Sequence, residues 1–213
     1  WKGVLPPLPD KPLLVFVSHR HEDHFNPAVF ALADRKADIQ FLLGNDFHLT
    51  PHNLTKWQLS PEIAAKCRRC GKHGTFTPLP GVTVETFPST DEGVAWMVTV
   101  NGQSIFHAGD LNWWHWAEED LAWNRNMEAN FKRYTEPLRG RRVDLAMLPL
   151  DSRLKMDGYL GPNYFLNLME VRRFLPMHQW EDFAFTDEFL SAYPQFAPIT
   201  VKIHRDGEFL GEL

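Results

Sequence analysis

Three histidines and an aspartate fall within six consecutive positions of this chain, in the pattern HxHxDH. They are His19, His21, Asp23 and His24. In an extended segment, side chains two positions apart point to the same side, so His19, His21 and Asp23 share one side, and His24 can turn toward a neighbouring position where a helix begins. Imidazole and carboxylate groups suit Zn²⁺, Mn²⁺ or iron. The cluster therefore predicts a metal site rather than a polar loop of exposed histidines.

A buried strand is expected directly before this cluster. Leu13–Val17 is an unbroken apolar run, and its length and β-branched content are typical of a strand buried on both faces. After the cluster, Asn26 and Pro27 have the pattern of a helix start and predict a helix over 28–33 with Asn26 as its N-cap. The metal-binding pattern thus lies just past the C-terminal end of a strand, where open α/β sheets place their sites.

The rest of the chain predicts further strands and helices in one domain over 1–213. We expect strands at 38–43, 82–87, 94–100, 104–107, 143–148 and 173–177, and helices at 117–134 and 164–172. Asn101-Gly102 predicts a tight hairpin turn. Residues 44–80 are expected to be irregular, except for a short helix that begins at Ser60 and ends near Arg69, and residues 199–210 to form a terminal hairpin.

Composition narrows the classes of function. The chain has 213 residues, of which 44% are hydrophobic, enough to fill a core. A net charge of -5 gives no electrostatic reason to expect binding to nucleic acid or to a membrane surface. Two cysteines are too few for a disulfide framework, and no apolar run has the roughly 18–20 residues of a membrane span. We expect a cytoplasmic protein that acts on a small molecule; the oligomeric state stays open.

The HxHxDH pattern resembles the signature of the metallo-β-lactamase superfamily. Two later segments match in the expected order: Phe106–Asp110 is similar to the family's strand that ends in a Gly-Asp pair, and Pro176–His178 to the late strand that delivers the last histidine. Val143–Pro149 also resembles the strand that precedes this region. The branch that looks most similar is that of L-ascorbate-6-phosphate lactonase. The resemblance implies an α/β fold, a four-layer αββα sandwich of two mixed β-sheets with flanking helices.

The resemblance also implies a set of site residues. His19 and His21 would bind a first metal ion. Asp23, His24 and His178 would bind a second, and Asp110 would bridge the two. Asp23 would also orient the hydroxide as the catalytic residue. The cofactor would be one or two divalent ions, zinc ahead of manganese or iron. The implied reaction is the attack of metal-activated water on a small ester-like substrate, a lactone or a phosphorylated metabolite.

The chain departs from the family pattern in two places. A third histidine of the first site is expected before the Asp110 segment, where this chain has Ser89, Thr90 and Asp91. Asp91 is either a substituted ligand or part of a simple turn, and His107 either supports a ligand or is a packed strand histidine. The family also has a β-hairpin before the HxHxDH strand, so here the fold is either trimmed or lacks native N-terminal residues.

Two other classes of function stay open at this point. An iron-dependent oxidoreductase of the same superfamily, such as a persulfide dioxygenase or a diiron oxidase, would use a similar ligand set. A catalytically degenerate metal-binding protein could have lost activity with the missing histidine. Fold does not choose among these. Of the smaller signals, the Cys67/Cys70 pair is expected to be an ordinary loop, and Trp113, Trp114 and Trp116 either a pocket wall or core.

Overall fold

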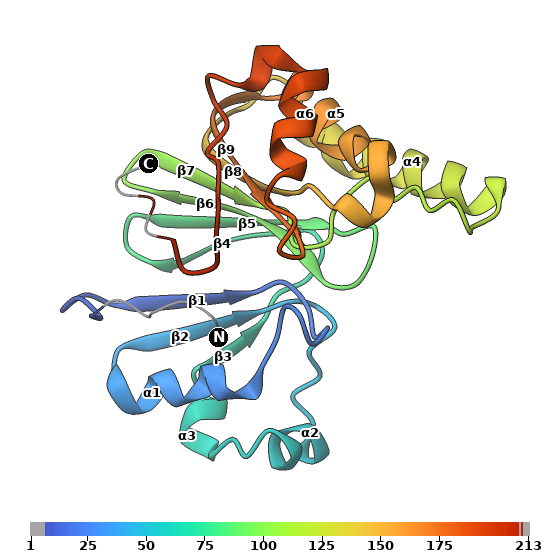
Figure 1. The fold of residues 1–213 in the computed structure, drawn as a ribbon. Helices are drawn as coiled ribbons and strands as arrows, with labels where there is room; N and C mark the ends of the chain where they lie inside the picture. Colours follow the sequence, from blue (N-terminus) through green and yellow to red (C-terminus); the bar gives the residue numbers. More distant parts are fainter. Residues whose placement is uncertain (1–6, 209, 211–213) are drawn as a thin grey trace.

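The computed structural model describes residues 7–208 and 210 as two β-sheets that face each other, with helices outside both (Figure 1). One sheet has three strands in the order β1-β2-β3, and the other has six in the order β4 to β9. Helices α1, α2 and α3 lie outside the first sheet, and α4, α5 and α6 lie outside the second (Figure 1). The four layers are those expected from the sequence.

The three-stranded sheet carries the HxHxDH segment at its edge. Its strands are β1 (Leu13–Val17), β2 (Ile39–Leu43) and β3 (Cys67–Arg69), and all are parallel. The short helices of this layer are a 3-10 turn (Pro27–Ala31), α1 (Leu32–Arg35), α2 (Pro51–Lys56) and α3 (Pro61–Ala64). The Asn26 side chain accepts a hydrogen bond from the backbone N–H of Ala28, as expected of an N-cap.

The six-stranded sheet is antiparallel from β4 to β7 and parallel from β7 to β9. Its strands are β4 (Gly74–Leu79), β5 (Val82–Pro88), β6 (Val94–Val100), β7 (Gln103–His107), β8 (Arg142–Pro149) and β9 (Glu170–Met177). Its helices are α4 (Leu121–Thr135), α5 (Leu160–Leu168) and α6 (Phe185–Ala192), with 3-10 segments at Glu136–Leu138, Ser152–Tyr159 and Pro194–Phe196.

Strand β1 is apolar on both faces because it lies between two cores. Leu13 and Val15 pack on the hydrophobic cluster between the three-stranded sheet and its helices, which contains Phe41. Leu14 and Phe16 pack on the cluster between the two sheets, which contains Trp96. The Phe16 ring meets Trp96 of β6 edge to face, with ring centroids 5.3 Å apart. This contact fixes the end of β1, and with it the HxHxDH segment, against the second sheet.

One local expectation is confirmed here, and two predicted helix ends are wrong. Asn101 and Gly102 have φ values of 50° and 83° and join β6 to β7, as a two-residue hairpin turn requires. The helix expected at 164–172 instead ends at Leu168, and β9 begins at Glu170 because that segment pairs with β8. The helix expected from Ser60 to Arg69 ends at Ala64, since 67–69 pair with β2.

Three further expectations need correction. Residues 44–80 are not irregular, because they contain α2, β3 and β4. The three-stranded sheet is parallel throughout, so only the larger sheet is mixed. The terminal hairpin is absent from the described residues: Thr200 forms one isolated bridge with Phe174, and residue 209 lies outside the described part. Within the described chain, no helix has the length and apolar character needed to cross a bilayer.

Candidate metal centre

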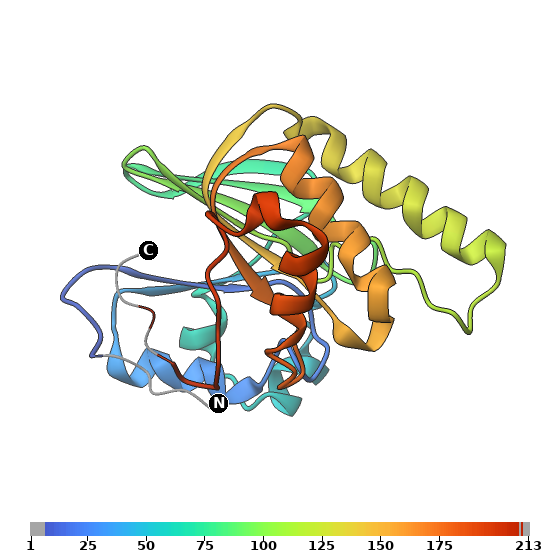
Figure 2. The same cartoon turned by 45° about the horizontal axis from the view of Figure 1, so that its top comes forward.

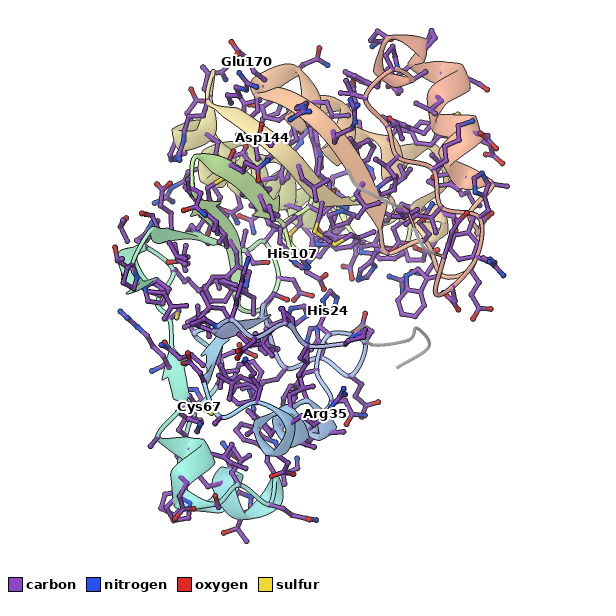
Figure 3. All side chains as sticks on the ribbon, turned by 90° about the vertical axis from the view of Figure 1, so that its left-hand side faces the viewer. His24, Arg35, Cys67, His107, Asp144 and Glu170 are labelled. Atoms are coloured by element: carbon purple, nitrogen blue, oxygen red, sulfur yellow. The ribbon has the colours of Figure 1, made fainter. Side chains whose placement is uncertain are left out.

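Three of the residues predicted as ligands, His19, His24 and His178, meet the carboxylate of a fourth, Asp110. Its Oδ2 lies 3.3 Å from His19 Nε2. Its Oδ1 lies 3.0 Å from His24 Nε2 and 3.2 Å from His178 Nε2. The three histidines come from the loops after β1 and β9, and Asp110 follows β7, so strand ends from both sheets build the site. In Figure 3, His24 lies at the junction of the two sheets.

The six side chains form two groups that could each hold a cation. One group is His19, His21 and Asp110, and the other is Asp23, His24 and His178; within each, the ligand atoms lie within 4.8 Å of one another. In the second group the Nε2 atoms of His24 and His178 are 3.0 Å apart. Asp110 belongs to the first group and touches the second. The arrangement has the form predicted from the sequence, and the assignment of ligands stays a prediction.

Two buried atoms at the centre of the site, His19 Nε2 and Asp110 Oδ1, make no well-aligned hydrogen bond, although each lies 3.0–3.3 Å from an ionisable side chain. His19 is fully buried and Asp110 is 5% exposed. A buried polar atom left unpaired costs about 1–3 kcal/mol, whereas a cation between these atoms would pair both. The residues present therefore fit a metal ion.

Hydrogen bonds behind the histidines fix which ring nitrogen faces the site. Ser18 Oγ lies 3.0 Å from His19 Nδ1, and Asp151 Oδ2 lies 3.0 Å from His178 Nδ1. In both rings Nε2 is left to face Asp110. Metal-binding histidines in proteins are oriented in this way by a partner on the other nitrogen.

The acids and histidines of the site shift one another's pKa. Burial alone would raise the pKa of Asp110, but hydrogen bonds with His178, His19 and His24 outweigh it and hold that pKa far below its usual range. Burial likewise opposes the charged form of His178, yet hydrogen bonds with Asp110 and Asp151 raise its pKa to about 9. The site thus favours an ionised Asp110 beside a protonated His178. A bound metal ion would take the place of the proton on His178 Nε2 as the source of positive charge.

The metal-free protein is expected to lose stability as the pH rises from about 6.5 to 9. The pKa of His178 is about 9 in the folded chain but about 6.5 in an unfolded one. A raised pKa stabilises the fold fully below the unfolded value, and this stabilisation is lost as the pH passes the folded value. Thermal melts of chelator-treated protein across this range test it. A His178→Asn variant should show a flatter dependence; an equally steep one would contradict the assignment.

Two glycines allow the HxHxDH segment to sit against the neighbouring loops. Gly93 has φ +75°, and a Cβ there would lie 2.0 Å from the carbonyl oxygen of Ser18 and 2.6 Å from His19 Cβ. Gly109 has φ +55°, and its Cβ would lie 2.7 Å from Ser18 Cβ. The backbone N–H of Val94 also donates to the Ser18 carbonyl at 3.1 Å. The loops before β6 and after β7 therefore hold Ser18 and His19 in place.

Gly93→Ala is expected to destabilise the protein and weaken metal binding. The added methyl group would displace the backbone of Ser18, so a loss of about 2–3 kcal/mol in the free energy of unfolding is expected. Gly102→Ala is the matched control, because Gly102 has φ +83° but nothing within 4 Å of its Cβ position. It should show only the backbone strain, about 1 kcal/mol. Denaturant titrations measure both; equal losses would mean that the close approach to Ser18 has no effect.

The segment that replaces the expected third histidine has mixed roles. Thr90 Oγ1 lies 2.7 Å from the carbonyl oxygen of Asn112 and 3.1 Å from that of Asp110, so it braces the loop that carries Asp110. Ser89 Oγ accepts the backbone N–H of Asp91. The Asp91 carboxylate is half-exposed and lies 3.8 Å from His21 Nδ1, outside both three-residue groups. The Asp91 carboxylate is thus near the first group of predicted ligands but is not a member of it.

His107 lies behind the site and belongs to neither group. Its Nδ1 accepts the backbone N–H of Gly109 at 3.0 Å, and burial lowers its pKa to about 4. A neutral His107 therefore shapes the turn that leads to Asp110. Cys67 and Cys70 also lie outside both groups, and burial raises the pKa of each thiol to about 11, which leaves them unreactive.

A cleft of about 610 Å³ opens onto the metal residues. Its lining includes Asp23, Asp110 and His178, together with the side chains of Trp114, Trp116, Trp123, Met127, Arg153 and Trp180. Sequence reasoning missed Asp151, Arg153, Trp123 and Trp180. Asp151 had one available signal, since it comes two residues after β8, at the sheet edge where sites lie.

Comparisons with known proteins agree on the fold. No family model matches the chain. Two proteins of Nitratidesulfovibrio vulgaris strains, each named UPF0173 metal-dependent hydrolase, are 26% identical over 181 residues, which is 82% of this chain and 65% of theirs. The chain thus spans about two thirds of the length of these relatives.

Solved structures give the same result at lower identity. A protein of Parabacteroides distasonis described as a metal-dependent hydrolase is 15% identical, with a TM-score of 0.60 over 92% of this chain and 78% of its own. The diiron β-hydroxylase CmlA of Streptomyces venezuelae is 9% identical, with a TM-score of 0.62 over 92% of this chain and 44% of its own. The metallo-β-lactamase fold protein YhfI of Bacillus subtilis is 12% identical, with a TM-score of 0.53 over 84% of this chain and 70% of its own.

These likenesses confirm that the chain has the fold of the metallo-β-lactamase superfamily. The narrower resemblance to L-ascorbate-6-phosphate lactonase finds no support among them.

Proposed function

We propose that this metallo-β-lactamase-fold chain is a metal-dependent hydrolase that acts on a small ester-like substrate. The observation that carries the proposal is the position of Asp110, whose two oxygens face two separate groups of metal-ligand side chains. The name of the Nitratidesulfovibrio relatives supports the same activity. A lactone or a phosphorylated metabolite is the substrate class proposed from the sequence.

When bound, one or two divalent ions would bring the pKa of their water to about 7 and stabilise the oxyanion of the reaction. His19, His21 and Asp110 would hold one ion, and Asp23, His24 and His178 the other. Zinc is the proposed metal, because histidine and carboxylate ligands suit it; manganese and iron have compatible ligand sets.

Asp23 is the proposed catalytic residue of this chain. Its carboxylate lines the cleft, and Oδ2 lies 3.4 Å from His178 Nε2 and 3.5 Å from His24 Nε2. The Asp23 side chain is 35% exposed and that of Asp110 6%, so Asp23 offers the larger accessible surface to a water molecule in the cleft. Asp23 can therefore accept a hydrogen bond from the attacking water and direct the oxygen lone pair toward the substrate.

Metal content and turnover test the proposal together. Protein purified without added metal is analysed for Zn, Mn and Fe, and then assayed with lactones, phosphodiesters and thioesters after loading with Zn²⁺ or Mn²⁺. We expect up to two ions per chain and turnover of an ester or lactone. Abundant iron with visible absorbance and no hydrolysis would favour the oxidoreductase alternative. Bound metal without turnover of any substrate would favour a binding protein.

A further inference from the structure

The cleft in front of the metal residues has an aromatic wall. The apolar side chains that line it are Trp114, Trp116, Trp123, Met127 and Trp180. The rings of Trp114 and Trp116 are nearly parallel, with an interplanar angle of 8° and centroids 6.2 Å apart. Trp123 and Met127 are four residues apart in α4 and therefore share one face of that helix. Helix α4 projects beyond the edge of the six-stranded sheet (Figure 2), and this face borders the cleft.

The charges of the cleft do not suit a phosphate group. Among the described residues that line it, Arg153 is the sole lysine or arginine. Its guanidinium already binds the carboxylate of Asp151, with Nη2 2.5 Å from Oδ2 and Nε 2.9 Å from Oδ1. It also lies between two indole rings, 4.3 Å from the centroid of Trp180 and 5.4 Å from that of Trp116. Asp151 therefore engages two of the Arg153 nitrogens and offsets much of the guanidinium charge, while the Arg153 side chain stays 44% exposed.

Apart from Arg153 and the proposed metal-binding histidines, the charged side chains that line the cleft are acidic. Glu22 and Asp91 line the cleft without belonging to the metal groups, and both are exposed. Asp23 and Asp110 would offset part of the charge of bound ions. An additional anion on the substrate would thus meet the carboxylates of Glu22 and Asp91, the latter 3.8 Å from His21 Nδ1, and no lysine or arginine besides Arg153 among the described residues of the lining. An uncharged group would lose little by leaving water.

We propose that this cleft selects an uncharged ester or lactone that carries a planar apolar group over a phosphorylated one. This inference rests on the proposed hydrolase function and narrows its substrate class. The planar group lies against Trp116 and the Trp123/Met127 face, and the acyl carbon faces Asp23. The water oxygen bonds to the acyl carbon, the acyl–oxygen bond breaks with its electron pair on the leaving oxygen, and one water proton ends on that oxygen. The acid formed releases the other proton.

The size of the preference follows from the apolar area that the wall can cover. A fused benzene ring that buries about 100 Å² of apolar surface gains a factor on the order of 50 in kcat/KM. We therefore expect dihydrocoumarin to exceed δ-valerolactone by about that factor in the metal-loaded protein, after the kcat/KM of each is divided by its rate constant for hydrolysis by hydroxide. This division removes the greater intrinsic reactivity of the phenyl ester. A δ-lactone that bears a phosphate group should be a poorer substrate than either.

Trp123→Ala tests the wall, and Leu121→Ala is its control on the same helix. Leu121 is 72% exposed and does not line the cleft. Trp123→Ala should reduce the ratio of dihydrocoumarin to δ-valerolactone turnover about tenfold, because part of the apolar contact is lost. Leu121→Ala should leave the ratio as in the wild type. In addition, benzamide, an uncharged aromatic amide, should shift the indole N–H signals of Trp116 and Trp123 in NMR spectra of the metal-free protein.

The outcomes separate this inference from the proposed function. If the metal-loaded protein hydrolyses the phosphorylated lactone as well as or better than dihydrocoumarin, the substrate preference is overturned and the hydrolase function stands. If benzamide shifts neither indole signal, the apolar subsite is overturned in the same way. If no ester or lactone is hydrolysed under any metal, both proposals fail together.

Discussion

Asp110→Ala is expected to remove metal from the protein and to reduce hydrolysis by about 10³-fold or more. Among the residues that the structure describes, Asp110 is the side chain whose oxygens face both groups, with Oδ2 toward His19 and Oδ1 toward His24 and His178. Without it, the first group keeps only His19 and His21, and the second group loses the carboxylate that faces His24 and His178. The loss corresponds to the several kcal/mol that a metal Lewis acid contributes to the transition state. Metal stoichiometry and kcat/KM of the same preparations measure both effects.

Asp187→Ala is the control for this substitution. Asp187 lies in α6 and forms an exposed ion pair with Lys202. Such surface pairs contribute at most about 1 kcal/mol, so this variant should keep its metal and its turnover. An Asp110→Ala protein that folds, binds the wild-type amount of metal and hydrolyses normally would contradict the bridging role.

The metal residues could be predicted because the chemistry is compressed into a short segment. His19, His21, Asp23 and His24 occupy six positions after a buried strand, and their spacing alone indicates a shared cation. Asp110 and His178 carry no such local pattern, and only the resemblance to a family identified them. The structure places both within 3.3 Å of that segment's histidines. The strands that deliver them, β7 and β9, were also predicted, although β9 begins three residues earlier than expected.

The supporting residues could not be predicted because their contacts are distant in sequence. Gly93 looks like the end of a polar turn, and its function becomes visible only where it meets Ser18, 75 positions earlier. The same cause explains the misplaced elements. β3 is a strand because β2 offers a free edge, and β9 begins at Glu170 because β8 lies beside it. The secondary-structure propensity of a segment does not depend on which strand lies beside it, so these strand boundaries could not be predicted from the local sequence.

Asp151 is the supporting residue with the largest expected effect. It is completely buried, and its carboxylate accepts hydrogen bonds from His178 Nδ1 at 3.0 Å and Trp180 Nε1 at 3.3 Å, besides the guanidinium of Arg153. Burial would raise its pKa, but hydrogen bonds with His178 and Arg153 outweigh it and lower the pKa to about 2. Asp151 is therefore an anion throughout the neutral range. It holds the His178 ring so that Nε2 faces the site, and it makes this ring a stronger donor.

Asp151→Asn is expected to weaken metal binding and kcat/KM by about 10- to 100-fold, the range typical of partners behind a metal-bound histidine. The amide keeps the shape and one acceptor for His178 but loses the negative charge. The pKa of His178, about 9 in the metal-free protein, should fall in this variant, which NMR titration of the ring can follow. Arg153→Met is the comparison variant. It removes the ion pair that anchors Asp151 but leaves the Asp151 carboxylate ionised beside His178. If both variants lost metal equally while the His178 pKa stayed near 9, Asp151 would serve only to anchor the loop. A fall confined to Asp151→Asn would mean that its charge acts on the metal through the histidine ring.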